Sequence, residues 1–373
     1  MVAGKLLRYA LSGEGFRQAA ALFGHCIGKS YDVVFAAGSQ VDLQWVIPAY
    51  VAARARGIVC ALAGPELKMP AGMEYINLPI RLFPLLRTRI IVTATTGLKA
   101  AHMPRQAVHR VAVPHSLVSL HMVYPEGTFD PYTDIFCCGS HHLAEIEAMN
   151  RLAGRADRRP TLIGYGKAER LLETRPKTTA SMDGRLHILI GPSWGKGNIL
   201  EAIGDPLLAR LLAQGYRVTL RPHPSFFILG NAQLAPLVEK WREHEAFALE
   251  NSLEESRALW TADLLIADYS GFAMEFAFMR ERPVLYIDVP SKVLNPKWGD
   301  VGSTPIELYI RDRIGIVVPP DVELVMDGLR KISQHDTEWS GRIHHERETA
   351  WVNLGHFGEA CAAELSNMLA KTA

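Results

Sequence analysis

The chain has 373 residues, of which 48% are hydrophobic and 21% are charged, so its length suits two domains and its composition excludes disordered and fibrous proteins. Forty Lys and Arg residues against 39 Asp and Glu residues leave a net charge of +1, which argues against a general nucleic-acid-binding protein.

The first thirty residues place apolar side chains at helical spacing between Lys5, Arg8, Arg17 and Lys29. This pattern predicts a basic amphipathic helix, which either packs on its own domain or lies on an anionic membrane surface. The segment lacks the apolar block and the cleavage site of a signal peptide, and the chain contains no run of eighteen apolar residues. We therefore expect a cytoplasmic protein whose membrane contact, if it has any, is peripheral and on the inner face of the cell membrane.

Short apolar runs that end in polar turns alternate with helical stretches from residue 31 onward. The runs that predict strands are 32–35, 58–62, 90–92, 111–113 and 135–138, then 187–190, 216–220, 264–267, 284–287 and 316–318, followed by a helix over 345–369. Residues 173–185 are polar and aperiodic, and predict a linker. The pattern indicates an α/β protein with two doubly wound, Rossmann-like domains, residues 1–172 and 186–373, that face a central cleft.

Two segments of the second domain are candidates for binding phosphate. A predicted buried strand ends at Asp268, and Ser270 and Gly271 open the following helix, whose free amides and dipole favour an anion. Ser270 alternatively serves only as a helix cap. The Gly191-Pro-Ser-Trp-Gly-Lys-Gly turn, which contains Ser193, resembles a phosphate-binding loop but is no Walker motif.

Two histidines follow predicted strands. His223 stands in Arg221-Pro-His-Pro, where a cation and an imidazole together suit a pyrophosphate. His115 stands in Pro-His-Ser on the first domain, where it suits a general base that accepts a proton from an incoming hydroxyl. For either residue the alternative is a structural histidine.

Residues 75–125 contain no Asp or Glu but six Lys and Arg residues: Arg81, Arg87, Arg89, Lys99, Arg105 and Arg110. We expect this basic stretch to attract an anionic acceptor or a membrane surface. The five cysteines form no C-x-x-C pair, which argues against disulfides and a zinc site. No D-x-D or H-E-x-x-H motif is present, and we expect neither a metal nor another cofactor.

The chain resembles the CDP-glycerol glycerophosphotransferase family, the teichoic acid primases and polymerases, over residues 105–365. The resemblance rests, in chain order, on Val113-Pro-His-Ser, Asp134-Ile-Phe-Cys-Cys-Gly-Ser, Ile163-Gly-Tyr-Gly, Ile190-Gly-Pro-Ser-Trp, Arg221-Pro-His-Pro, Asp268-Tyr-Ser-Gly with its Glu-Phe-Ala continuation, and Arg282-Pro-Val-Leu-Tyr. It implies a GT-B fold, His115 as the base, and His223 and Ser270 as donor-phosphate ligands. The chain departs from the family pattern twice: Ser-Leu follows His115 in place of Gly-Thr, and Gly271 replaces a second Ser.

The resemblance implies transfer of a polyol phosphate, such as glycerol phosphate, from a CDP-activated donor to a hydroxyl of a surface-polymer or lipid-linked acceptor, with release of CMP. Catalysis would fall to His115 and His223, and donor binding to Ser193, Arg221, Asp268, Ser270 and Gly271. One alternative keeps the fold but acts on a UDP-sugar, as a glycosyltransferase or 2-epimerase. Another is a binding protein that has lost catalysis.

Overall fold

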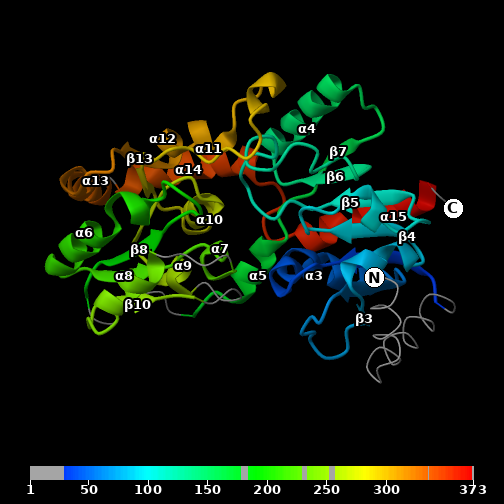
Figure 1. Cartoon of the computed structure of the whole chain (residues 1–373), viewed down its shortest axis with the longest axis horizontal. Helices are drawn as coiled ribbons and strands as arrows, with labels where there is room; N and C mark the ends of the chain where they lie inside the picture. Colours follow the sequence, from blue (N-terminus) through cyan, green and yellow to red (C-terminus); the bar gives the residue numbers. More distant parts are fainter. Residues whose placement is uncertain (1–28, 178–183, 229–232, 252–256, 335, 372–373) are drawn as a thin grey trace, which may run out of the picture.

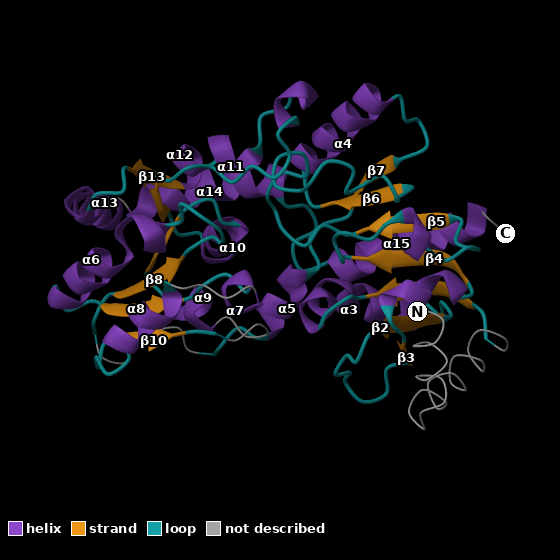
Figure 2. Cartoon of the chain, viewed as in Figure 1, coloured by secondary structure: helices purple, strands orange, loops and turns teal. Residues whose placement is uncertain are grey.

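The computed structural model describes residues 29–177, 184–228, 233–251, 257–334 and 336–371 (Figure 1). The predicted amphipathic start lies outside these residues, apart from its last two. Within them the chain forms two lobes, each built on a parallel sheet with helices around it (Figure 2). The predicted α/β class with two doubly wound domains is confirmed.

The first sheet has seven strands in the order β3-β2-β1-β4-β5-β6-β7. Its strands are β1 (Tyr31–Ala36), β2 (Cys60–Gly64), β3 (Tyr75–Asn77), β4 (Thr88–Thr93), β5 (His109–Ala112), β6 (Asp134–Cys137) and β7 (Arg159–Leu162). The helices of this part are α3 (Gln40–Ala55), α4 (Ser140–Ala153), α5 (Lys167–Glu173) and the 3-10 turns η1 (Ile80–Leu85) and η2 (Ala100–His102). The strand order reverses between β1 and β4, which is where α/β sheets open a crevice for ligands.

The second sheet repeats this order with six strands, β10-β9-β8-β11-β12-β13. Its strands are β8 (His187–Gly191), β9 (Arg217–Leu220), β10 (Phe247–Leu249), β11 (Leu264–Ala267), β12 (Val284–Ile287) and β13 (Gly315–Val318). The helices that follow them are α6 (Ile199–Ala213), α7 (Ser225–Ile228), α8 (Leu234–Trp241), α9 (Arg257–Thr261), α10 (Gly271–Arg280), η3 (Trp298–Val301), α11 (Ile306–Tyr309), α12 (Arg311–Ile314) and α13 (Val322–Gln334). The central strands are buried along their length, as parallel strands covered by helices must be.

The C-terminal part differs from the prediction in two ways. The expected single helix over 345–369 is two helices, α14 (Asp336–Ala350) and α15 (Phe357–Lys371). Furthermore, α15 packs on α3 and α5 of the first domain, although we expected residues 186–373 to form the second (Figure 1). The absence of a side chain at Gly358 permits this packing, because a Cβ there would lie 2.7 Å from the Pro48 carbonyl oxygen.

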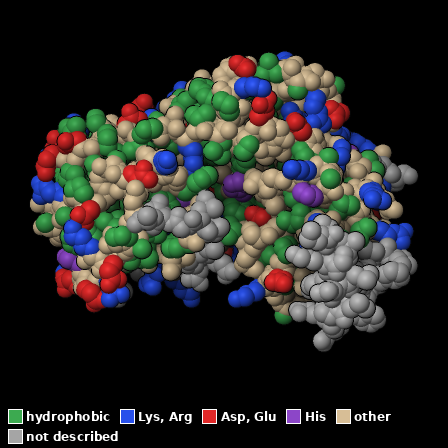
Figure 3. Space-filling model, in the orientation of Figure 1, with side chains coloured by type: hydrophobic (Ala, Val, Ile, Leu, Met, Phe, Trp, Pro, Cys, Tyr) green, Lys and Arg blue, Asp and Glu red, His purple; other side chains and the backbone are tan. Residues whose placement is uncertain are grey.

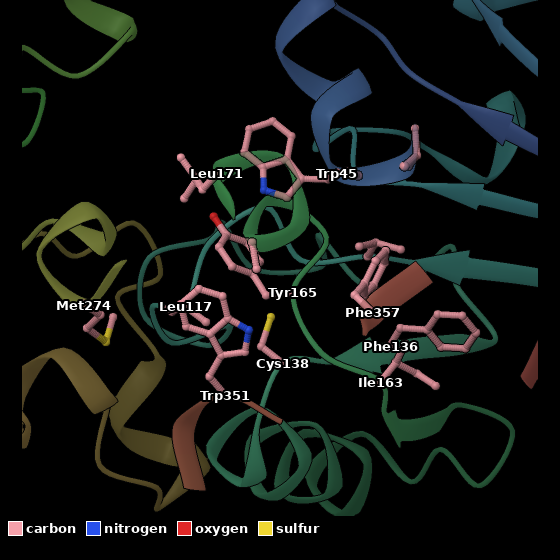
Figure 4. Close-up of a cluster of buried hydrophobic side chains, with 14 of the residues drawn as sticks. Trp45, Leu117, Phe136, Cys138, Ile163, Tyr165, Leu171, Met274, Trp351 and Phe357 are labelled. Carbon is pink, nitrogen blue, oxygen red and sulfur yellow. The ribbon is translucent and has the colours of Figure 1, made fainter. Parts of the chain in front are cut away.

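One hydrophobic cluster of the described residues spans both domains, and each sheet has a further cluster of its own. Side chains from the inner faces of both sheets join in a single buried cluster. In Figure 4 Tyr165 lies between Trp45 of α3 and Trp351, which connects α14 to α15. The Tyr165 and Trp351 rings meet edge to face, with centroids 5.4 Å apart. The chain also returns from the second domain to the first after α14. This return and the ring packing together fix how the two domains face each other.

Candidate functional site

The His223 side chain is oriented by the backbone that follows it. The amide N–H of Ser225, at the start of α7, donates to His223 Nδ1 over 3.1 Å. Because an amide can only donate, Nδ1 is the acceptor and the proton of the neutral imidazole lies on Nε2. Burial lowers the pKa of His223 to about 3, and the positive charges of Lys292, Lys167 and Arg221, together with His115 when it is protonated, add to this. His223 is therefore a neutral hydrogen-bond donor at physiological pH.

Arg221, the other half of the expected phosphate clamp, has a carboxylate partner. Its guanidinium lies 3.4 Å from Glu250 Oε2, and both side chains are nearly buried, at 12% and 13% exposure. It also lies over the Phe272 ring, 5.2 Å from the ring centroid. The charge of Arg221 is thus already balanced by a protein group.

Asp268 shapes the loop that contains Ser193. Its carboxylate is fully buried and accepts from the Ser193 amide over 2.8 Å and from the Ile199 amide over 3.3 Å. Burial raises the pKa of Asp268, while the hydrogen bonds from Ser193 and Ile199 act in the opposite direction. Gly195 within this loop has a φ of 92°, which favours glycine. Asp268 therefore helps to hold the loop that contains Ser193.

Ser270 is the N-cap of α10, and its Oγ accepts from the Phe272 amide over 3.3 Å. The hydroxyl proton of a capping serine remains available, so this cap is compatible with phosphate binding. Gly271 lies against the first domain, since a Cβ there would be 2.2 Å from Ser116 Oγ. The two departures from the family pattern, after His115 and at position 271, thus lie in contact with each other.

His115 follows β5 in the first domain and lies between two aromatic rings. Its ring centroid is 5.7 Å from that of Trp45 and 5.3 Å from that of Tyr124, and the Tyr124 hydroxyl is 3.2 Å from His115 Nδ1. Burial, followed by the charge of Lys167, lowers the pKa of His115 to about 4. A small pocket beside it lies at the ends of β4 and β5 and is lined by Thr93, Ala94, Thr95, Thr96, Ala112, Val113, Pro114, His115, Tyr124, Thr128, Phe129 and Tyr132.

The segment after His115 is anchored by buried polar side chains of both domains. The anchoring pairs are His141 with the Leu117 carbonyl, His142 with the Val118 carbonyl, Glu145 with the Leu120 amide, and Glu307 with the amide and hydroxyl of Ser119. Glu307 comes from α11 of the second domain. The position of His115 therefore depends on contacts with both domains.

Two groups at the site were not predicted. Lys167 of α5 pairs with Glu275 of α10 at 2.6 Å, and Glu275 also accepts from the Tyr165 hydroxyl over 2.7 Å. Lys292, in the loop after β12, lies over the Trp194 ring. The sequence feature that could have identified Lys292 is its position after a predicted strand of the same sheet as Arg221 and Ser270.

Among the described residues, no three His, Cys, Asp or Glu side chains gather as metal ligands would.

No protein-family model and no curated protein matches the sequence. Solved structures do match. The wall teichoic acid polymerase TagF superposes with a TM-score of 0.62 at 13% identity, over 98% of this chain and 97% of that chain. The UDP-GlcNAc 2-epimerase from Neisseria meningitidis bound to UDP-GlcNAc has a TM-score of 0.61 at 12% identity, over 91% of this chain and 99% of that chain. S. aureus MnaA with UDP has a TM-score of 0.61 at 11% identity, over 91% of this chain and 96% of that chain. The chain therefore has the GT-B fold.

The site as a whole lies between the lobes, at the ends of strands from both sheets. The space-filling view is hollowed there, and a histidine side chain is visible in the hollow (Figure 3). His115, Lys167, Arg221 and Lys292 all act electrostatically on His223, so the structure brings them together. Asp268 differs from these groups in that its carboxylate accepts hydrogen bonds within the loop, although its charge also acts on Lys292. No helix of the described residues is long and apolar enough to cross a membrane.

Proposed function

We propose that this chain is a transferase that moves a polyol phosphate, such as glycerol phosphate, from a CDP-activated donor to a hydroxyl of a surface-polymer or lipid-linked acceptor, with release of CMP. The observation that carries this proposal is that a histidine segment of each domain lies at the start of α10: Ser116, next to His115, lies against Gly271, and Arg221 of the His223 segment lies over the Phe272 ring. Phosphoryl transfer needs chiefly positioning and electrostatic stabilisation, together with a group that accepts the proton of the attacking hydroxyl.

In the proposed mechanism His115 is the base. When its proton lies on Nδ1, that N–H donates to the Tyr124 oxygen and Nε2 is free. The acceptor hydroxyl then loses its proton to Nε2 as its oxygen forms a bond to the β-phosphorus of the donor. The bond between the β-phosphorus and the bridging oxygen breaks, and CMP leaves with the electron pair.

In the same mechanism the second domain stabilises the phosphates. His223 donates its Nε2–H, and the Ser270 hydroxyl and the first amides of α10 supply further donors. Ser193 lies in the neighbouring loop held by Asp268. Arg221 acts on the phosphates through its electrostatic field and not as a direct ligand, because its guanidinium is paired with Glu250.

On the acceptor side, four basic residues of the acid-free stretch are exposed in the first domain: Arg81, Arg87, Lys99 and Arg105. Their field favours a polyanionic acceptor or an anionic lipid surface, with the protein in peripheral contact with the membrane. Co-sedimentation with anionic vesicles, compared with neutral vesicles, tests this part.

A second candidate is action on a UDP-sugar, as a glycosyltransferase or a 2-epimerase. It is favoured by the similar TM-scores of the UDP-GlcNAc 2-epimerase structure and of the polymerase. It would use the same two histidines with attack at a sugar carbon in place of phosphorus.

Incubation with a panel of CDP-polyols and UDP-sugars, with acceptor supplied, tests the proposal. We expect CMP to be released from a CDP-polyol. Release of UDP, or conversion of a UDP-sugar, would favour the second candidate, and failure of calorimetry to detect any nucleotide binding would favour a protein that has lost catalysis.

A further inference from the structure

Lys292 is held at the donor side of the site by the loop that contains Ser193. Its Nζ lies 3.4 Å from the centroid of the Trp194 ring and donates a hydrogen bond to the Trp194 carbonyl oxygen. The Trp194 ring in turn lies 6.2 Å from the His223 ring, centroid to centroid. Lys292 is therefore linked through the Trp194 ring to the imidazole that we place on the donor phosphates, and its charge acts on that imidazole. Its Nζ has further protons to donate.

The basic groups that act on His223 differ in whether a carboxylate balances them. Lys167 is paired with Glu275 at 2.6 Å, and Arg221 with Glu250 at 3.4 Å. His115 is neutral at physiological pH, since its pKa is lowered to about 4. In the part of the chain that the structure describes, no carboxylate lies within ion-pair distance of Lys292 Nζ. Lys292 is thus the cation of this group whose charge is not balanced by a carboxylate in direct contact.

A half-buried ammonium without a counter-charge is costly for a protein to hold. Burial lowers the pKa of Lys292 to about 7, and the more distant charge of Asp268 only partly opposes this. A bound phosphate would supply the missing negative charge beside His223 and the N-terminus of α10.

The Lys292 loop is also fixed to the first domain. The amides of Leu294 and Asn295 both donate to the Met122 carbonyl, over 2.9 and 3.1 Å, and the Asn295 side chain donates to the His121 carbonyl over 2.9 Å. Met122 and His121 belong to the segment that follows His115. The backbone just after Lys292 is therefore anchored on the same segment that follows the proposed base.

We propose that Lys292 binds the phosphates of a nucleoside diphosphate group in the donor. It would supply the positive charge that the uncharged donors His223 and Ser270 lack. This inference rests on the proposed function, because it assumes a nucleotide-activated donor. It holds whether the nucleotide is a cytidine or a uridine, since the phosphates are common to both.

Isothermal titration calorimetry with CDP, UDP, cytidine and uridine tests the inference, using wild type, Lys292→Gln and Lys292→Arg. The matched control is Lys331→Gln, which removes an exposed lysine of α13. We expect Lys292→Gln to weaken diphosphate binding by about tenfold or more, because a charge-assisted hydrogen bond is lost, and to leave nucleoside binding unchanged. Lys292→Arg should retain most of the affinity, and Lys331→Gln all of it.

Repeating the titrations slightly above neutral pH in buffers of different ionisation enthalpy adds a readout that a structural role would not change. Bound phosphate favours charged Lys292, so wild type should take up protons on binding, and this uptake should be smaller in Lys292→Gln. Wild-type affinity and proton uptake in Lys292→Gln would overturn the inference while leaving the proposed function intact. Failure of wild type to bind either diphosphate would overturn both.

Discussion

At the scale of single residues, the two histidines of the site differ in what determines their protonation. An amide N–H fixes the Nε2–H form of His223, whereas His115 faces a tyrosine hydroxyl that can donate or accept. This difference suits a fixed hydrogen-bond donor in the second domain and a proton acceptor in the first.

Replacing His223 with Ala should reduce turnover at least about tenfold, because a hydrogen bond to the transition-state charge is lost. The variant should melt like wild type, as measured by circular dichroism. His244 is a matched control, since its Nδ1 likewise accepts a nearby amide, that of Ala246, and it lies outside the site. Unfolding of His223→Ala would identify His223 as a structural residue.

The pH dependence of kcat/KM should have two limbs. Activity should fall below a pH of about 4, where His115 gains a proton and can no longer act as the base. It should also fall above a pH of about 7, where free Lys292 loses the proton that phosphate binding requires. Initial rates with a CDP-polyol, taken only where the protein remains folded, measure both limbs. Persistence of the alkaline limb at the same pH in Lys292→Arg would show that another group causes it.

At the scale of elements, the structure shows why α10 begins with glycine. Ser270 caps the helix, and the next residue lies against Ser116 of the opposite domain. The other atoms near a Cβ at position 271 lie at ordinary contact distances, about 3.5 Å. The small residue at 271 and the serine at 116 are therefore a matched pair across the domain interface.

A double-mutant cycle of Gly271→Ala and Ser116→Ala tests this pairing. In the Ser116→Ala background, Gly271→Ala should raise the free energy of unfolding by about 0.5–1 kcal/mol, because alanine favours the helix. In the wild-type background the clash with Ser116 Oγ should cancel that gain. Urea unfolding measures both effects, and equal effects in the two backgrounds would show that the residues do not interact.

At the scale of the whole molecule, the sequence predicted both sheets because their central strands are continuous apolar runs. The strands 264–267 and 284–287 match β11 and β12 residue for residue. The short strands β3, β7 and β10 were not predicted; they have three or four residues each and, with exposed positions, lack a buried pattern.

The sequence patterns could not predict contacts between segments that lie far apart in the chain. The return of α15 to the first domain depends on close backbone contact at Gly358. The pairing of Arg221 with Glu250 and the position of Lys292 likewise depend on contacts between distant segments. The candidate histidines could be found because each directly follows a strand, where the sheet edge brings loops together.

The buried pair between Lys167 and Glu275 joins α5 to α10 and should stabilise the domain arrangement as long as both partners are present. Lys167→Met should lower the free energy of unfolding by about 3–5 kcal/mol, because it leaves a buried carboxylate uncompensated. Lys167→Met with Glu275→Gln should recover most of this loss in urea unfolding.

The pair of Lys240 with Asp205 is the matched control, at 2.7 Å but with side chains 54% and 46% exposed. Lys240→Met should cost less than about 1 kcal/mol, because water screens exposed charges. Equal losses at the two sites would contradict the role assigned to the buried pair.

The central claim is that a base from the first domain acts on a donor held by the second, and single-turnover transfer by His115→Ala tests it most directly. With CDP-glycerol as donor, donor affinity should remain nearly that of wild type, because the phosphate ligands lie in the second domain. Transfer should fall by a factor of about 100 or more, the contribution typical of a positioned general base. Circular dichroism and the melting temperature control for folding. Transfer at the wild-type rate in a folded His115→Ala protein would contradict the account.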